Sequence, residues 1–249
     1  MNRDFRKRLR AGDLLLGTMV TFGSSETAEV LASVGFDWLF LDAEHSPMEA
    51  SDLQRVIQGA GSVPCVVRLP ASAEVPVKKA LDIGAAGIIA PMVNSAEQAA
   101  EVVRFAKYSP QGTRGVGLGR AHGYGLKFRE YMDSANENVA VIVQAEHIDA
   151  VKNIERIIRV AGIDGVLVGP YDLSGSLGRP GEVGHPEVRE AIDRVTEACR
   201  NARIPLGIFG LSAEAVIPYI KGGYTLIVAG VDTVMLGHAA KQLLAQLRA

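Results

Sequence analysis

Val34-Gly35-Phe36-Asp37-Trp38-Leu39-Phe40-Leu41-Asp42-Ala43-Glu44-His45 is the stretch of this sequence that indicates the fold most directly. Gly35 suits the left-handed conformation with which many α-helices end. The apolar run from Trp38 to Leu41 follows almost at once and is typical of a buried β-strand. The stretch therefore predicts a helix, a glycine and then a buried strand, with only a short connection between them.

The same pattern recurs along the chain, at Ile83-Gly84-Ala85-Ala86 and at Ala161-Gly162-Ile163-Asp164-Gly165. Eight short apolar runs alternate with amphipathic segments. These runs are Leu16–Thr21, Trp38–Leu41, Cys65–Leu69, Gly87–Pro91, Val139–Glu146, Gly165–Gly169, Pro205–Gly210 and Thr225–Gly230. Apolar strands that alternate with helices indicate a parallel sheet buried on both faces. Eight such units in 249 residues favour an α/β fold with a single closed (β/α)8 TIM barrel over an open, doubly wound sheet.

No linker or change of composition indicates a second domain, so residues 1–249 are expected to form one barrel domain. One glycine-rich excursion, at about residues 109–127 (SPQGTRGVGLGRAHGYGLK), interrupts the alternation. It contains too much glycine for a regular helix or strand. A connection of this length is typically functional or part of an interface.

Charge and composition exclude several classes of protein. The net charge of −2 and the pI of about 6.2 argue against a nucleic-acid-binding protein. The basic run from Arg3 to Arg10 is short and is interrupted by Asp4 and Phe5, so we expect a solvated helix face there. No apolar window is long enough for a membrane span or a secretory leader, which predicts a cytoplasmic protein. Cys65 and Cys199 are expected to be small buried residues.

Ionisable residues gather where the predicted strands end. A buried strand has no packing reason to end in Asp42, Glu44 and His45, because unpaired charged groups are costly to desolvate. Alone, this stretch would also fit a solvated loop. Other strand ends carry Arg68, Pro91-Met92, Gln144-Ala145-Glu146-His147 and Gly169-Pro170-Tyr171-Asp172-Leu173-Ser174. Because parallel barrels place their active sites at the carboxyl ends of the strands, the distribution indicates an enzyme.

Two carboxylates on adjacent strands, Glu146 and Asp172, could share one divalent cation such as Mg²⁺ or Mn²⁺. The alternative is that Glu146 forms a structural salt bridge with Arg68. The guanidinium of Arg68 lies in an apolar strand and therefore needs an acidic partner or an anionic ligand.

His45 is the one histidine beside two carboxylates at a strand end, which favours a general base near neutral pH. We expect His147 to point to the opposite face of its strand, in a supporting or interface position. The histidines expected at surface or interface positions are His122, His185 and His238. No lysine lies at a strand end, which argues against Schiff-base chemistry.

Taken together, these motifs resemble the HpcH/HpaI family of class II pyruvate aldolases. The resemblance extends from about Gly17 to Ala240, nearly the whole chain. It is carried by Asp42-Ala43-Glu44-His45, Val67-Arg68, Ala90-Pro91-Met92, Thr113-Arg114-Gly115-Val116, Gln144-Ala145-Glu146 and Gly169-Pro170-Tyr171-Asp172-Leu173-Ser174.

The resemblance implies a barrel that depends on Mg²⁺, Mn²⁺ or Co²⁺. Such an enzyme reversibly cleaves a 4-hydroxy-2-oxoacid to pyruvate and an aldehyde through a metal-stabilised pyruvate enolate. By matching positions, Glu146 and Asp172 would bind the metal, His45 would be the base and Arg68 would stabilise the enolate. A chelated 2-oxoacid has a more acidic C3 proton, which suits removal by a histidine.

The resemblance also implies how the substrate is held. Gln144 and the backbone at Tyr171 and Asp172 would bind the carboxylate and keto oxygens of pyruvate. Asp42 and Glu44 would order the metal's water molecules and the imidazole rather than bind the ion.

An aspartate matching Asp82 would raise the basicity of the catalytic histidine. Asp82 precedes the fourth strand, at the opposite end of its own barrel. We therefore expect it to come from a neighbouring subunit of a homo-oligomer, a trimer or a hexamer.

The sequence departs from the family pattern at two places. His147 follows the metal-binding glutamate, where the family usually has a small or hydroxyl residue. Tyr171 replaces the more usual Ala or Ser and would narrow the pocket, while Met19-Val20-Thr21-Phe22 offers no charged partner for a sugar-acid tail. The alternative functions are citrate-lyase-like or phosphoenolpyruvate-mutase-like chemistry on the same barrel, and a non-catalytic acid-binding barrel.

Overall fold

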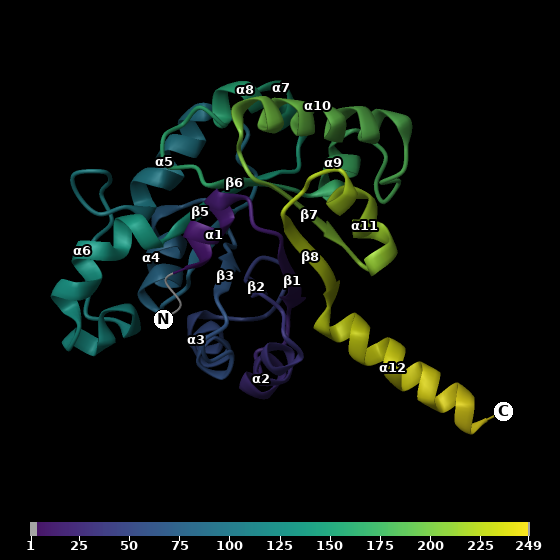
Figure 1. Ribbon diagram of the computed structural model, residues 1–249, viewed down its shortest axis with the longest axis horizontal. Helices are drawn as coiled ribbons and strands as arrows, with labels where there is room; N and C mark the ends of the chain where they lie inside the picture. The colour runs from purple at the N-terminus through teal and green to yellow at the C-terminus, as the bar shows by residue number, and fades with distance from the viewer. Residues whose placement is uncertain (1–3, 249) are drawn as a thin grey trace.

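The computed structural model describes residues 4–248 and shows a closed barrel of parallel strands, ordered β1 to β8 as in the sequence (Figure 1). The strands are β1 (Leu15–Val20), β2 (Trp38–Asp42), β3 (Cys65–Arg68), β4 (Gly87–Ala90), β5 (Ala140–Ala145), β6 (Gly165–Val168), β7 (Leu206–Gly210) and β8 (Leu226–Val231). Helices alternate with the strands, so the predicted (β/α)8 architecture is confirmed.

Helices cover the outside of the barrel, except that α12 projects away from it (Figure 1). The helices are α1 (Phe5–Ala11), α2 (Ser25–Val34), α3 (Ala50–Gly59), α4 (Glu74–Asp82), α5 (Ala96–Ala106), the 3-10 helix η1 (Arg120–Gly125), α6 (Phe128–Asn138), α7 (Ile148–Lys152), α8 (Ile154–Ile157), α9 (Pro170–Ser176), α10 (Pro186–Ala202), α11 (Ala213–Lys221) and α12 (Asp232–Leu247). No helix within residues 4–248 combines the length and the apolar character needed to cross a bilayer.

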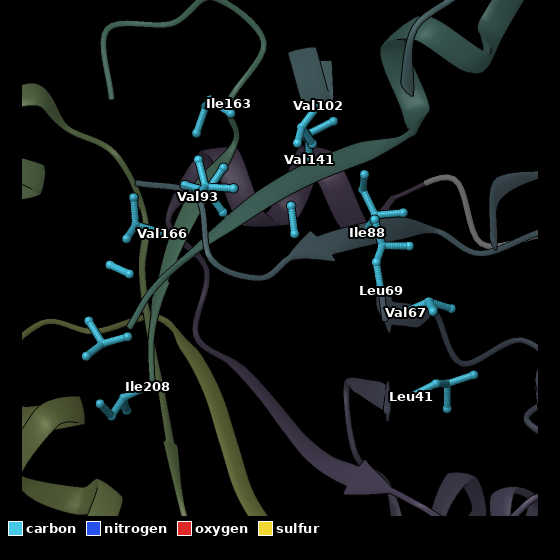
Figure 2. Close-up of a cluster of buried hydrophobic side chains, with 14 of the residues drawn as sticks. Leu41, Val67, Leu69, Ile88, Val93, Val102, Val141, Ile163, Val166 and Ile208 are labelled. Carbon is cyan, nitrogen blue, oxygen red and sulfur yellow. The ribbon is translucent and has the colours of Figure 1, made fainter. Parts of the chain in front are cut away.

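The strands place alternate side chains in two different cores. Leu41, Val67 and Val141 belong to the layer between the strands and the helices, part of which Figure 2 shows. Trp38 and Phe40 belong to the cluster inside the barrel. Because side chains alternate across a strand, the next inward position after Phe40 is Asp42. The periodicity that builds the core therefore also directs the last side chain of β2 into the carboxyl end of the barrel.

Helix α1 closes the opposite, amino-terminal end of the barrel. Phe5 and Leu9 are buried in the interior cluster, and the Phe5 ring lies 5.7 Å from the Trp38 ring, centroid to centroid. Arg6 Nε donates to Asp164 Oδ2 at 2.8 Å. The prediction of a solvated helix face is confirmed for Lys7 and Arg10, which are exposed. The apolar side of the same helix was not predicted. Arg3 lies outside the described residues.

All three predicted glycines have a left-handed φ, 103° at Gly35, 95° at Gly84 and 101° at Gly162. Gly35 and Gly84 lie at helix ends as predicted, whereas Gly162 lies in a turn, because α8 already ends at Ile157. Two helix expectations need correction. The amphipathic segment Ala150–Val160, which by its pattern would form one helix, is divided into α7 and α8 at Asn153, and α8 ends at Ile157. The sequence pattern does not indicate α6, which follows the glycine-rich excursion, because its charged and polar residues hide a narrow apolar face formed by Tyr131 and Ala135.

The excursion itself contains one short regular element, η1, and a buried aromatic cluster. His122, expected at the surface, is fully buried, and its Nε2 lies 3.1 Å from the Tyr108 hydroxyl. Its ring meets that of Tyr131 at 4.5 Å, edge to face. The burial of His122 was not predictable from the sequence. Its partners lie on other elements, and they share no periodic pattern with it.

We predict that Phe5→Ala lowers the free energy of unfolding by about 3–5 kcal/mol, because it opens a cavity beneath Trp38. The exposed Lys7→Ala, on the same helix, is the matched control and should change stability by less than about 0.5 kcal/mol. Urea denaturation followed by tryptophan fluorescence measures both. Equal midpoints for the two variants would show that α1 does not support the barrel.

Candidate active site

A cavity of about 270 Å³ lies at the carboxyl ends of the strands. Its polar lining consists of His45, Arg68, Gln144 and Asp172, four of the residues predicted from the sequence. They come from the ends of β2, β3 and β5 and from the start of α9. The barrel thus brings together side chains that are up to 127 positions apart in the chain (172 − 45).

Arg68 and Asp42 form a buried ion pair at the base of this cavity. They are direct partners in the register of β2 and β3. Arg68 Nε donates to Asp42 Oδ1 at 2.9 Å and Arg68 Nη2 donates to Oδ2 at 2.7 Å. A two-point pair of this kind fixes the plane of the guanidinium. The Arg68 guanidinium also lies over the Phe40 ring at 5.3 Å.

Asp42 also shapes the loop that carries His45. Its Oδ1 accepts from the backbone N–H of Glu44 at 3.1 Å and from that of His45 at 3.2 Å. The His45 side chain is 63% exposed, and its Nε2 lies 3.8 Å from Glu44 Oε2. The carboxylate of Asp42 is therefore engaged with Arg68 and the loop backbone, and the imidazole extends from a fixed backbone toward the solvent side of the cavity.

Glu146 lies just beyond β5, buried at 2% exposure. Its Oε1 accepts from the backbone N–H of Met92 at 2.6 Å, and its Oε2 accepts from the amide of Gln144. Burial raises the pKa of Glu146 to about 7; the Met92 N–H opposes this shift, and nearby Glu44 and Asp172 add to it. The alternative salt bridge is not formed, because the ion pairs of Arg68 are with Asp42 and Glu44.

Two positions to which the sequence analysis gave no role of their own hold this arrangement. Met92 adopts a left-handed φ of 53°, and its N–H donates to Glu146. At Gly169, a Cβ would lie 2.9 Å from both Gln144 Nε2 and Glu146 Cβ. The glycine is thus required by the close approach of β5 to the end of β6. Both residues belong to strand-end motifs that are visible in the sequence. Their roles depend on contacts with the neighbouring strand, which the sequence does not show.

Asp172 and Tyr171 lie in the first turn of α9, after the N-cap residue Gly169 and Pro170. Both side chains are exposed at the cavity, and Tyr171 is 39% exposed. His147 is not part of the cavity lining. It is the N-cap of α7, where its Nδ1 accepts from the backbone N–H of Asp149 at 3.1 Å.

The donor set suits a hard divalent cation. Glu146 and Asp172 offer carboxylate oxygens, and Gln144 Oε1 is a buried acceptor without a hydrogen-bond partner. Such an orphaned oxygen is expected where an ion or its water molecules would sit. Residues 4–248 contain no cluster of three or more Asp, Glu, His or Cys side chains placed to bind a metal. Two protein carboxylates would leave other coordination positions to a chelating substrate and water, as Mg²⁺ prefers.

Asp82 lies at the end of α4, before β4, and so at the opposite end of its own barrel from His45. Arg114 Nη2 donates to Asp82 Oδ1 at 2.7 Å; the Arg114 side chain is fully buried and that of Asp82 is 28% exposed. Arg114 lies over the Tyr108 ring at 4.6 Å. A Cβ at Gly119 would meet the Asp82 backbone oxygen at 2.7 Å, so the glycine-rich segment packs against this helix end.

Comparisons with known proteins lead to the same family that the sequence motifs resemble. The family model for HpcH/HpaI aldolase/citrate lyase matches residues 19–239. A 4-hydroxy-2-oxovalerate aldolase of Rhodococcus jostii (strain RHA1) is 38% identical, over 97% of this chain and 95% of its own. A 4-hydroxy-2-oxo-heptane-1,7-dioate aldolase of Shigella sonnei (strain Ss046) is 37% identical, over 99% of this chain and 95% of its own.

Among solved structures, an HpcH/HpaI aldolase/citrate lyase family protein from Burkholderia cenocepacia J2315 superposes with a TM-score of 0.95. The two sequences are 37% identical and each chain is covered completely. The family name includes both the aldolase hypothesis and its citrate-lyase-like alternative, and both curated relatives are named aldolases. With this fold, this cavity and these relatives, the chain belongs to the HpcH/HpaI aldolase/citrate lyase family and is a lyase of the aldolase type.

Proposed function

We propose that this protein reversibly cleaves a 4-hydroxy-2-oxoacid to pyruvate and an aldehyde, with the help of a divalent metal ion. The observation that carries this proposal is the presence of an exposed imidazole, a fixed guanidinium and the Asp172 carboxylate around one cavity, with the buried Glu146 hydrogen-bonded to Gln144 of its lining. The names of both curated relatives describe hydroxy-oxoacid aldolases.

Each residue has a distinct part in the proposed reaction. A cation held by Glu146 and Asp172 would supply Lewis acidity at the keto oxygen of the substrate. His45, exposed at the cavity, exchanges a proton with the carbon next to that keto group. Arg68, oriented by Asp42, places a fixed positive charge where oxygen becomes negative in the transition state.

The pyruvate carboxylate would be held at the start of α9 and by Gln144. The first backbone N–H groups of a helix lack intrahelical partners and favour anions. Gln144 uses one amide hydrogen for Glu146, which leaves a second for the substrate. We propose Mg²⁺, Mn²⁺ or Co²⁺ as the metal. A cytoplasmic location is proposed as well, and the two free, buried cysteines are compatible with it.

We further propose a homo-oligomer, a trimer or a hexamer, in which Asp82 of one subunit completes the site of another. The glycine-rich segment that packs against the partly exposed Asp82, together with the start of α6, exposes several apolar side chains, namely Val116, Leu118, Tyr124, Leu126 and Phe128. Exposed apolar clusters of this kind support a protein–protein interface.

The projecting helix α12 also supports self-association (Figure 1). It exposes Leu236, Leu243, Leu244 and Leu247. The side chain of Leu16 on β1 is 41% exposed, although a strand of this barrel type normally has a helix over its outer face. A second copy of the chain would cover both the exposed leucines of α12 and the exposed side chain of Leu16.

The proton-transfer step can be tested without knowing the aldehyde. In deuterated buffer with Mn²⁺, the pyruvate methyl group should exchange its protons, and EDTA should abolish the exchange. His45→Ala should lower the exchange rate at least about 100-fold, the usual contribution of a general base, while His185→Asn, outside the cavity, should not change it. Proton NMR measures the rate, and metal-independent exchange would contradict the proposal.

Metal binding should depend on both carboxylates and on pH. Because the metal competes with a proton on Glu146, whose pKa is about 7, Mn²⁺ affinity should be constant above pH 7 and fall with decreasing pH below it. Glu146→Gln should remove this dependence along with most of the affinity. Full Mn²⁺ occupancy in Asp172→Ala, measured by calorimetry, would contradict the assignment of Asp172.

A shared site predicts complementation between inactive variants. His45→Ala and Asp82→Asn should each be inactive alone. Subunits unfolded together and refolded at equal amounts should regain about a quarter of the wild-type exchange rate, because one site in four combines an intact histidine with an intact aspartate of its neighbour. If the mixture stays inactive while its mixed oligomers are shown by native mass spectrometry, Asp82 does not act across subunits.

A further inference from the structure

The catalytic cavity divides into a polar part and an apolar part. The polar part is lined by His45, Arg68, Gln144 and Asp172, and the buried Glu146 is hydrogen-bonded to Gln144. The apolar part is formed by Met19, Phe40, Leu167, Tyr171 and Phe209. If pyruvate occupies the polar part, the carbon chain of the aldehyde must lie against the apolar one.

Within residues 4–248, the cavity offers no free cation for a second carboxylate. Arg68 is the one guanidinium in its lining, and that group is already paired with Asp42, while Glu44 Oε2 lies 3.4 Å from Arg68 Nε. The two side chains assigned to the metal, Glu146 and Asp172, carry carboxyl groups and offer no positive charge. A carboxylate on the far end of an aldehyde would therefore lose its hydration without gaining a cationic partner, which is costly.

Two aromatic rings close the cavity on the side of β6 and β7. The Tyr171 and Phe209 rings lie 6.1 Å apart, tilted by 54°. Both rings also line a second cavity of about 420 Å³, whose other walls come from α10 and α11. This second cavity is lined by Arg189 and, one helical turn further, by Asp193; Arg189 is exposed and forms no ion pair within residues 4–248. An unpaired guanidinium thus lies on the other side of the two rings.

We propose, on the basis of the aldolase function above, that Tyr171 and Phe209 form a specificity wall. The wall admits short, uncharged aldehydes and keeps longer aldehydes with a distal carboxylate away from Arg189. The curated relatives differ in this respect, since the name oxovalerate describes an acid with one carboxyl group and heptane-1,7-dioate one with two. The wall places this chain with the single-carboxylate substrates.

The test compares two aldehydes of equal chain length, butanal and succinic semialdehyde, as acceptors for pyruvate in the presence of Mn²⁺. The wild type should favour butanal in kcat/KM by about tenfold or more, because the carboxylate of the other acceptor stays unpaired. Tyr171→Ala should raise kcat/KM for succinic semialdehyde at least about tenfold, since it joins the two cavities. Tyr171→Phe, which keeps the ring, should retain the wild-type preference.

The role of Arg189 is tested in the Tyr171→Ala variant, in which the two cavities are joined. Tyr171→Ala with Arg189→Ala should lose the gain for succinic semialdehyde but keep any gain for hexanal, a long uncharged acceptor. The matched control is Arg194→Ala, on the same helix but paired with Glu155 and outside the second cavity, which should leave both gains in place. Loss of the gain with Arg194→Ala as well would overturn the assignment of Arg189.

Exchange of the pyruvate methyl protons separates this proposal from the aldolase function. Absent exchange in the wild type would contradict the function, whereas normal exchange with equal use of both aldehydes would overturn only the wall. If Tyr171→Ala itself impairs exchange, Phe209→Leu removes the other ring without altering α9 and should shift the preference in the same direction. An unchanged preference in that variant overturns the proposal.

Discussion

The ion pair between Arg68 and Asp42 is the constraint on which the active site depends. Both side chains are almost completely buried at the carboxyl ends of adjacent strands, directly opposite each other in the sheet register. Removing one partner from such a pair leaves an uncompensated charge, at a cost of about 3–5 kcal/mol. The pair is therefore a requirement of the fold as much as of the chemistry, and it holds both the guanidinium and the loop that carries His45.

The rest of the site is built on this base by the geometry of the barrel. Inward positions of β5 continue from Ala140 and Ile142 to Gln144, and Glu146 follows two residues later. Gly169 lets the end of β6 approach these side chains, and the backbone of Met92 supplies a hydrogen bond to the buried carboxylate. A buried acid with a pKa near neutrality is the expected result, because burial is only partly offset by that hydrogen bond.

Particular residues show how far sequence reasoning extends. The eight strands and the left-handed conformation of Gly35, Gly84 and Gly162 were predictable, because apolar periodicity and glycine conformation are local properties. The buried position of His122 and the closing role of Phe5 were not, since both depend on partners far away in the chain. The partner of Arg68 was not predictable either: Glu146 was the alternative weighed from the sequence, and the register of β2 and β3 places Asp42 opposite the arginine instead.

The sequence alone determines the strands and the end of the barrel at which the ionisable residues lie. Both follow from the side-chain period within each strand and from the direction of the strands. Which of those residues touch is a property of the assembled barrel. Register pairs Asp42 with Arg68, close packing at Gly169 joins Gln144 to Glu146, and the ring of Tyr171 on α9 meets that of Phe209 on β7. These contacts depend on distances between separate segments, which no periodicity within one segment can specify.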